Sequence, residues 1–515
     1  MSVEAGRFAA TWPEMLDLHG VAAVGEAASL VSDGDLSEDV HVLAAVYLCS
    51  TFVDTGHDRE VLNDRLARTL AAGPVEVHDG ISARTAAAHL QACLDLDQPA
   101  LAFETAQRYA REIEHLTSAQ FVEAEGPLPW LWLSLSNAHH STSEDRAASL
   151  FLRRVEEGSV AYTRLSAVAE LTVAYALGGA THRAREYLAR FESLSHARPE
   201  LVSAYHRVLV DTGAGVIHAS FLETEDALSC SDRVIAISPR VGWIYGAWAV
   251  RGHALRLDGK AREAVSQMAP LIVAAPQVRM RPRVRTGAEF AYTAALVASG
   301  RPGVLAGELR SRHLDPKHHT CYEGLRAVAF LSVGLPRHAL ESTDACLALG
   351  SDHNLRTLPE ALVARAAALR GLGRPGAALT TLDTALDLLD VSGPAAYAYL
   401  PKRVLAELVE SAERSGRAIP PAVSGLLDRP DSPLDVTAAT LGSLTPRQRE
   451  LLRAMQGPQT LAGLSSQFFL SLNTLRVHTR NIYRALGVNS RDEAVAMAQY
   501  AGFFEFDLTD APSPE

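Results

Sequence analysis

A short motif that recurs along much of the chain constrains the fold more than any other feature of the sequence. In this motif a glycine is followed five positions later by alanine, with copies at Gly179, Gly259, Gly334 and Gly373 and a weaker one at Gly300. Apolar residues elsewhere recur at spacings of three and four, and strand patterns are nearly absent. Glycine can end one helix in the left-handed conformation, and a small alanine one turn into the next helix lets two helices cross closely. The motif therefore predicts a series of helical hairpins.

The spacing of the motif indicates how much of the chain these hairpins occupy. Successive glycines from Gly259 to Gly373 are 41, 34 and 39 residues apart. Similar breaks occur toward the N-terminus, near Gly215, Gly179, Thr142, Gln98, Gly56 and Gly20. Roughly ten units of about 40 residues would fill residues 1–416. We therefore predict an all-α chain in which residues 1–416 form an α-solenoid of helical hairpins, which resembles a degenerate tetratricopeptide-like array.

The helical pattern ends after residue 416. Residues 417–440 contain four prolines, which cannot lie inside one helix, and this composition predicts a proline-rich linker. A small domain at residues 441–504 would follow, and then an acidic, disordered tail at residues 505–515.

Charge is unevenly distributed between these parts. The chain has 48 basic and 60 acidic residues and a net charge of −12. Residues 441–504 carry seven arginines against three acids, a local charge of +4, whereas residues 1–440 carry −12. A basic module attached to an acidic body favours a nucleic acid as the partner of the module. We do not expect the body itself to bind DNA.

Cysteine usage and hydropathy indicate the compartment. The five cysteines are an odd number and include no Cys-x-x-Cys pair, which favours a reducing environment. No stretch reaches the ~18 apolar residues of a membrane span, and the first residues do not have the pattern of a secretory signal. We expect a cytoplasmic protein that does not associate with membranes.

The segment SLNTLRVHTRNIYRALGV, residues 471–488, predicts a two-faced helix with a defined start and end. Ser471 can cap its first turn, and Gly487 suits the left-handed position after its last turn. One arc of the helix would hold Asn473, Arg476, Val477, Arg480 and Arg484. The opposite arc would hold Leu475, Thr479, Ile482 and Leu486. The polar arc fits a DNA-binding face, and the alternative is a surface helix whose arginines are merely solvated.

Two stretches around this helix resemble the C-terminal helix-turn-helix domain of the LuxR family of bacterial transcription regulators. They are LTPRQRELL, residues 444–452, and LSLNTLRVHTRNIYRALGVNSRDEAV, residues 470–495. The match covers about 60 residues and includes Glu450, the Ser-x-Asn-Thr opening at Ser471, Leu486-Gly487, and Arg491 with Ala494. The resemblance implies a small four-helix domain whose recognition helix, at about residues 473–486, enters the major groove of double-stranded DNA.

The resemblance also implies roles for individual residues. Arg476, Val477 and Arg480 would face base edges, and Asn473 lies on the same face. Thr474 and Arg484 would contact phosphates. The last helix, residues 491–502, would pair two copies into a homodimer. Contact with RNA polymerase is a further expectation.

One segment departs from the family pattern. Where family members carry Ser-Asn-Lys-Glu-Ile-Ala, this chain has Thr-Leu-Ala-Gly-Leu-Ser at residues 460–465. Ala462 replaces a phosphate-contacting lysine, and Gly463 should weaken the helix by about 1 kcal/mol, although Thr460 can still cap it. Two functions therefore remain open: a sequence-specific transcription regulator, or a helical-repeat interaction scaffold whose degenerate helix-turn-helix no longer binds DNA.

Few features in the remainder of the chain indicate which effector or partner regulates the protein. It contains neither a phosphate-binding loop nor the pattern of a receiver domain, and it resembles the C-terminal half of the large maltose-regulator-type LuxR proteins without their ATPase domain. An unknown effector or partner would therefore act through the helical array. Trp130, Trp132, Trp243 and Trp248 are candidates for a groove lining, and the alternative is that they are core residues.

Clusters of histidine raise the question of a metal or catalytic site. Residues 316–323 contain His318, His319, Cys321 and Glu323, and His139 and His140 are adjacent. Adjacent side chains on a helix diverge, and His319 with Glu323 would supply only two ligands. We predict no enzyme activity, catalytic residue, cofactor or metal site. The sequence does not predict the target genes, the operator, the effector, the direction of regulation, or whether the array masks the DNA-binding domain.

Overall fold

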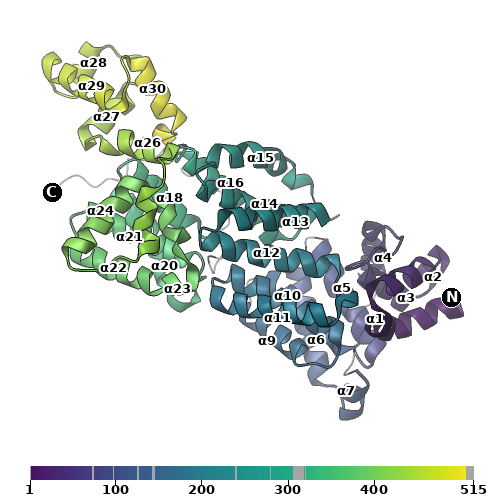
Figure 1. Ribbon diagram of the computed structural model, residues 1–515. Helices are drawn as coiled ribbons and strands as arrows, with labels where there is room; N and C mark the ends of the chain where they lie inside the picture. Colours follow the sequence, from purple (N-terminus) through teal and green to yellow (C-terminus); the bar gives the residue numbers. More distant parts are fainter. Residues whose placement is uncertain are drawn as a thin grey trace. The chain divides into compact units, whose positions relative to one another are not determined.

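The computed structural model describes residues 2–71, 75–96, 98–124, 127–141, 145–237, 241–278, 280–304, 318 and 320–505 (Figure 1). Throughout these residues every regular element is a helix, which confirms the predicted all-α class. The chain divides into two compact units. Unit 1 comprises residues 1–218, 225–250 and 271–288, and unit 2 comprises residues 219–224, 251–270 and 289–515. The helices described here include none long and apolar enough to cross a membrane.

The helices of unit 1 follow one another with short connections. They are α1 (Val3–Ser29), α2 (Asp33–Glu38), α3 (Val40–Cys49), α4 (Arg59–Ala71), α5 (Gly80–Asp95), α6 (Pro99–Glu114), α7 (Ser118–Ala124), α8 (Leu128–Ser141), α9 (Asp145–Glu156), α10 (Ala161–Leu177) and α11 (Thr181–Ala197). Five further helices lie where the chain passes between the ranges of the two units: α12 (Ala204–Ser220), α13 (Thr224–Ile237), α14 (Val241–Leu257), α15 (Ala261–Ala274) and α16 (Pro282–Ala298).

Unit 2 continues with shorter helices. They are α18 (Tyr322–Ser332), α19 (Pro336–Ser342), α20 (Asp344–Leu349), α21 (Leu358–Gly371), α22 (Pro375–Asp387), α23 (Leu389–Ser392), α24 (Lys402–Arg414), α25 (Pro421–Ser424), α26 (Pro433–Thr440), α27 (Pro446–Ala454), α28 (Leu461–Gln467), α29 (Leu472–Leu486) and α30 (Arg491–Tyr500). Short 3-10 turns lie between some of them, including η4 (Gly350–Asp352), η5 (Pro394–Tyr399), η6 (Gly425–Asp428) and η7 (Leu441–Ser443).

The glycine motif forms the turn between two described helices at Gly179, Gly259, Gly334 and Gly373, as predicted, whereas the chain that follows Gly300 lies outside the described residues from residue 305. Its glycines all have positive φ: 81° at Gly179, 78° at Gly259, 89° at Gly300, 74° at Gly334 and 72° at Gly373. The residue after the glycine donates its N–H back to the preceding helix, as Ala180 does to the Tyr175 carbonyl at 2.9 Å. The motif alanines are at most 1% exposed: Ala184, Ala264, Ala339 and Ala378. Paired helices such as α10 with α11 and α21 with α22 therefore pack closely at these small residues.

The predicted breaks toward the N-terminus were only partly right. Gly56 lies in the loop before α4, and Gln98 precedes α6. Gly20, with φ of 83°, lies at a kink within α1. Gly215 is a wrong prediction because it lies inside α12, where a Cβ atom would meet Val250 Cγ1 at 2.7 Å. That glycine permits close helix packing rather than a turn. Thr142 lies outside the described residues.

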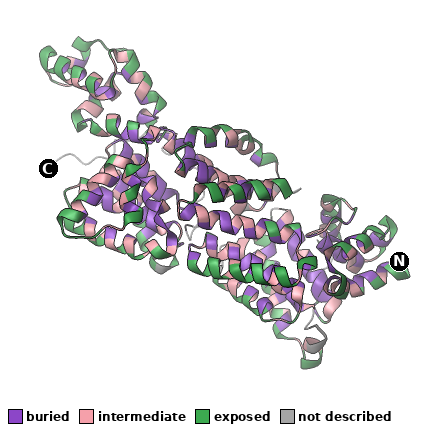
Figure 2. Ribbon diagram, viewed as in Figure 1, coloured by how far each residue is buried: buried purple, intermediate pink, exposed green. Residues whose placement is uncertain are grey.

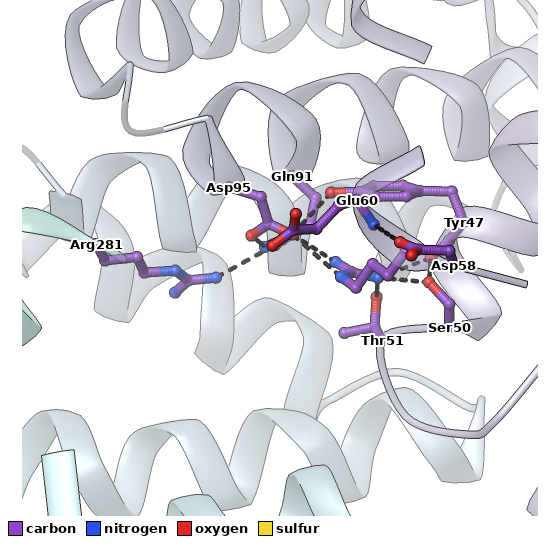
Figure 3. A network of polar contacts seen from close by, with 9 residues as sticks. Tyr47, Ser50, Thr51, Asp58, Glu60, Gln91, Asp95 and Arg281 are labelled. Atoms are coloured by element: carbon purple, nitrogen blue, oxygen red, sulfur yellow. Dashed lines mark hydrogen bonds and ion pairs between the residues drawn. The ribbon is translucent and has the colours of Figure 1, made fainter. Parts of the chain in front are cut away.

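Buried residues gather where the helices lie against one another, and exposed residues line the outer helix faces (Figure 2). Unit 1 also encloses polar groups. Asp95 on α5 accepts hydrogen bonds from Tyr47 and Gln91, both at 2.8 Å, and pairs with Arg59 at 2.7 Å (Figure 3). Burial alone would raise the pKa of Asp95, but Arg59 and Arg281 together keep it below its usual value. This network connects α3, α4 and α5.

The structure differs from the predicted linker. Residues 417–440 fold into α25, η6 and α26, with Val423, Leu426 and Leu434 buried. Pro421 and Pro433 each occupy the first turn of a helix, where a missing N–H costs no hydrogen bond. The prolines therefore separate short helices instead of marking an extended chain. The domain boundaries at 416, 440 and 504 remain predictions, and the predicted tail beyond Glu505 lies outside the described residues.

Candidate nucleic-acid interface

Four helices near the end of unit 2 form the predicted small domain, and each of them begins with a side-chain cap. Thr445 caps α27, Thr460 caps α28, Ser471 caps α29 and Ser490 caps α30. The Ser471 hydroxyl accepts from the Thr474 N–H at 3.1 Å, and Gly487 ends α29 in the left-handed conformation with φ of 67°. The predicted start and end of the recognition helix are therefore those of the structure.

The turn between α28 and α29 is tight. The Leu470 N–H returns to the Ser465 carbonyl at 3.0 Å, and Phe469 has a positive φ of 53°. A phenylalanine in this conformation is unusual because its Cβ crowds the backbone. The Phe469 side chain is 96% exposed. The sequence does not predict this conformation, because phenylalanine is not a residue type that favours positive φ.

Helix α29 separates its two faces as the apolar spacing predicts. Leu475, Thr479, Ile482 and Leu486 are buried against the rest of the domain. All six predicted DNA-binding residues are exposed: Asn473, Thr474, Arg476, Val477, Arg480 and Arg484. Val477 is 46% exposed although it is apolar, so this face has not been selected for packing within the domain.

The seven arginines of the domain divide into two groups. Four of them hold the domain together: Arg447, Arg449, Arg453 and Arg491. Arg447 donates to the Phe468 carbonyl at 2.7 Å and pairs with Glu450 at 2.7 Å, and Arg453 donates to the Phe503 carbonyl at 3.0 Å. Arg491 donates to three backbone carbonyls between α27 and α28, at 2.5 to 2.8 Å. These contacts fix the loop from which α28 begins.

The other three arginines lie on the exposed face of α29. Arg484 is 3.3 Å from the Asn481 side-chain oxygen. Neither Arg476 nor Arg480 makes an ion pair or a hydrogen bond with any residue that the structure describes. Their positive charges are therefore not neutralised by nearby acids, and their donors remain available to a partner.

The segment that departs from the family pattern still forms a helix. Thr460 caps α28 through the Gly463 N–H at 3.3 Å, as predicted. Gly463 is exposed, and a Cβ atom there would be in ordinary contact with Gln459. The helix-turn-helix geometry therefore does not require the usual residues in this segment.

The four tryptophans considered for a groove lining differ in how far they are buried. Trp130 and Trp132 are buried, and Trp130 packs on Trp12 at 4.7 Å and on Tyr162 at 5.3 Å between ring centroids. These two are core residues of unit 1. Trp243 is half-buried and lies 5.8 Å from Tyr205, and Trp248 is also half-buried. His139 packs between Phe103 and Phe151, and the His140 carbonyl accepts from Arg283 at 2.7 Å.

These four capped helices form a helix-turn-helix domain. A tight turn precedes α29, and the outer face of α29 is basic. Residues 442–498 match the family model described as "Bacterial regulatory proteins, luxR family". The match confirms the resemblance, and this part of the chain is a LuxR-type helix-turn-helix domain. The matched family is one of regulatory proteins rather than a class of enzymes.

Two individual proteins are also similar to parts of this chain. "Probable transcriptional regulatory protein SgaR" of Hyphomicrobium methylovorum is 36% identical to this chain over 95 residues, which are 18% of this chain and 41% of that protein. The chain thus spans less than half the length of this curated relative. A chain in the "Crystal structure of APC/C hetero-tetramer Cut9-Hcn1" is similar over 83% of this chain and 96% of its own, with 14% identity and a TM-score of 0.35. That score is too low to assign a fold to residues 1–416, and their tetratricopeptide-like character remains a prediction.

Proposed function

We propose that this protein is a sequence-specific, DNA-binding transcription regulator that reads the major groove with α29. The observation that carries the proposal is the pair Arg476 and Arg480, which are exposed and unneutralised on a helix whose other face is fixed in the domain core. Such a helix has the width and the side-chain donors that major-groove recognition needs.

Each residue of the exposed face has a distinct proposed role. Arg476 and Arg480 donate to guanine O6 and N7, Val477 contacts a thymine methyl group, and Asn473 pairs with adenine. Thr474, at the N-terminus of α29, and Arg484, near its end, contact phosphates and so position the helix.

A homodimer through residues 491–502 is part of the proposal. Ala494 and Ala498 pack inside the domain, whereas Gln499 and Tyr500 are exposed on α30. Tyr500 is an exposed aromatic residue of the kind that anchors interfaces. Two copies related by a two-fold axis would bind two half-sites, which compensates for the weak binding expected of one domain that lacks the usual lysine. Contact with RNA polymerase belongs to the same proposal, as does location in the cytoplasm.

A cavity of about 310 Å³ in unit 2 is the proposed effector site. Arg256 and Arg429 line it, and the guanidinium of Arg256 lies 3.6 Å from the ring centroid of Tyr399. The Nε atoms of both arginines are buried without a hydrogen-bond partner among the described residues. Arg256 is buried, whereas Arg429 is half-buried and already pairs with Asp435 at 3.7 Å, so Arg256 is the cation that favours a small anionic effector. Ser432, which caps α26, and Leu434 of α26 also line the cavity, and α26 leads into the helix-turn-helix domain, so occupancy can influence that domain.

This effector site is tested by thermal shift with a panel of small carboxylates and phosphates. Compounds that raise the melting temperature of wild type but not of Arg256→Met identify the effector class. A panel in which no anion distinguishes the two proteins contradicts the assignment of the cavity.

The proposed function is tested by enrichment of sheared genomic DNA from the source organism on the full-length protein. Wild type is expected to enrich a small set of fragments with a shared two-fold site, and Arg476→Ala/Arg480→Ala to enrich none. A matched control is Arg403→Ala/Arg414→Ala, which removes the same charge from exposed positions on α24. Equal enrichment by all three proteins, or none by wild type, would reject the regulator and leave the interaction scaffold.

A further inference from the structure

Four potential metal ligands meet in the interior of unit 2, away from the helix-turn-helix domain. His318 precedes α18, Cys321 immediately precedes the first residue of α18, Cys346 lies in α20 and His353 follows η4. All four side chains are buried, and one ligand atom from each lies within 4.8 Å of the others. The segments that contribute them are up to 35 residues apart in sequence, so the fold brings this set together.

The distances within this cluster match those between the ligands of a tetrahedral zinc ion. Cys321 Sγ and Cys346 Sγ are 3.4 Å apart, and they lie 3.6 and 3.5 Å from His318 Nδ1. Zinc bonds of about 2.3 Å to sulfur and 2.0 to 2.1 Å to nitrogen imply tetrahedral edges of about 3.8 Å between two sulfurs and about 3.6 Å between sulfur and nitrogen. Cys321, Cys346 and His318 therefore need to move by only a few tenths of an ångström to accept the ion, and the ligand atom of His353 lies within 4.8 Å of theirs.

The surroundings orient both histidines as ligands. His353 Nδ1 lies 2.9 Å from the Asn354 carbonyl, which fixes the proton on Nδ1 and leaves the lone pair on Nε2. That Nε2 atom is buried and has no hydrogen-bond partner among the residues that the structure describes. The Thr357 hydroxyl donates to the His318 carbonyl at 2.6 Å and holds the backbone there at a positive φ of 51°. Unfavourable backbone geometry that is held in place this way is common at ligand sites.

One neighbouring candidate, Glu323, is already paired. Glu323 is buried, but Arg326 pairs with it at 3.1 Å. His319, which the sequence places next to His318, lies outside the described residues. Cys49, Cys93 and Cys230 are equally buried, yet within the described part of the chain none belongs to such a His/Cys group, so burial alone does not produce the cluster.

We propose that His318, Cys321, Cys346 and His353 bind one Zn²⁺ ion in a closed, four-coordinate structural site. Two thiolates and two neutral imidazoles are a donor set that selects zinc, and all four positions are filled by protein, which leaves none for a substrate. Binding forms two Zn–S and two Zn–N bonds and releases the two thiol protons to solvent. The ion ties the start of α18 to α20 and to the turn after η4, in a part of the unit where the helices are short.

Metal analysis of the full-length protein, purified under reducing conditions without added metal, tests this site. Wild type is expected to carry one zinc per chain by mass spectrometry of the elements. The zinc content per chain is expected to fall roughly tenfold or more in Cys321→Ser and in Cys346→Ser. Cys230→Ser, which changes a buried cysteine elsewhere, is expected to keep its zinc. Wild type without zinc, or equal zinc in all three variants, overturns the proposal.

Three measurements on wild type keep the test decisive if a variant fails to fold. A thiol-specific mercurial is expected to release one zinc per chain to a colorimetric chelator. Cobalt added to the chelator-treated protein is expected to produce a thiolate charge-transfer band and the intense visible bands of a tetrahedral ion. A titration of the unfolded protein that finds three thiols instead of five would show a Cys321–Cys346 disulfide and refute the metal site.

Discussion

Replacing Arg491 with alanine tests whether the helix-turn-helix geometry depends on the hydrogen bonds of a side chain that is not among the proposed DNA contacts. The guanidinium donates to the carbonyls of Met455, Gly457 and Gln459 at 2.8, 2.5 and 2.5 Å. A hydrogen bond from a charged group contributes about 1.5–3 kcal/mol, and the half-buried position of Arg491 places each bond at or below the low end. Arg491→Ala should therefore destabilise the loop before α28 by about 2–4 kcal/mol.

Hydrogen exchange followed by mass spectrometry measures this loss locally. Amides of residues 455–486 that exchange through local opening should do so roughly 30- to 800-fold faster in Arg491→Ala, since each 1.4 kcal/mol is a factor of ten. Helix α10 of unit 1 is the internal control and should not change. Arg491→Lys should recover only part of the protection because an ammonium group cannot reproduce the planar fork. Unchanged exchange in residues 455–486, or full recovery of protection with lysine, would refute the stabilising role of the Arg491 hydrogen bonds.

Four further substitutions test other parts of the account. Gly463→Ala should stabilise the domain by about 0.5–1 kcal/mol because its Cβ meets only ordinary contacts; a lower urea midpoint would contradict this. Leu475→Ala should cost about 2–5 kcal/mol since Leu475 is fully buried, whereas Val477→Ala should leave the unfolding midpoint unchanged; equal midpoints would mean that the two faces of α29 are misassigned. Burial raises the pKa of Glu360 to about 7, so the stability contributed by its neutral form is complete below about pH 4.5 and is lost as the pH rises through 7. Glu360→Gln should therefore melt like wild type at pH 4.5 and at a higher temperature than wild type at pH 8, and identical melting at pH 8 would refute the neutral carboxyl.

The hairpin turns and the recognition helix could be predicted because their determinants are local. A glycine at positive φ followed by a buried alanine appears directly in the sequence, as does a serine cap followed by apolar residues on one face of α29. Gly215 shows the limit of this reasoning, because a glycine selected for close packing inside a helix looks the same in sequence as one selected for a turn. The folded segment at 417–440 was missed because prolines in the first turn of short helices resemble prolines in a linker.

The His/Cys cluster could not be predicted for a different reason. Its members come from segments that only the tertiary fold brings together, and the sequence has no Cys-x-x-Cys pair to mark them. In the sequence, His318 and Cys321 have too few potential ligands among their immediate neighbours to complete a metal site. Cys346 and His353 complete the set from α20 and the turn after η4.

Titration of an enriched DNA fragment with full-length protein at two salt concentrations tests the central claim most directly. Arg476→Ala/Arg480→Ala should weaken binding by roughly 2–6 kcal/mol, and binding should depend less steeply on salt than in wild type. Arg484→Ala should instead weaken binding to all sequences similarly and reduce the salt slope by about one. Affinity that is the same for wild type and the double variant at both salt concentrations would contradict DNA recognition by α29.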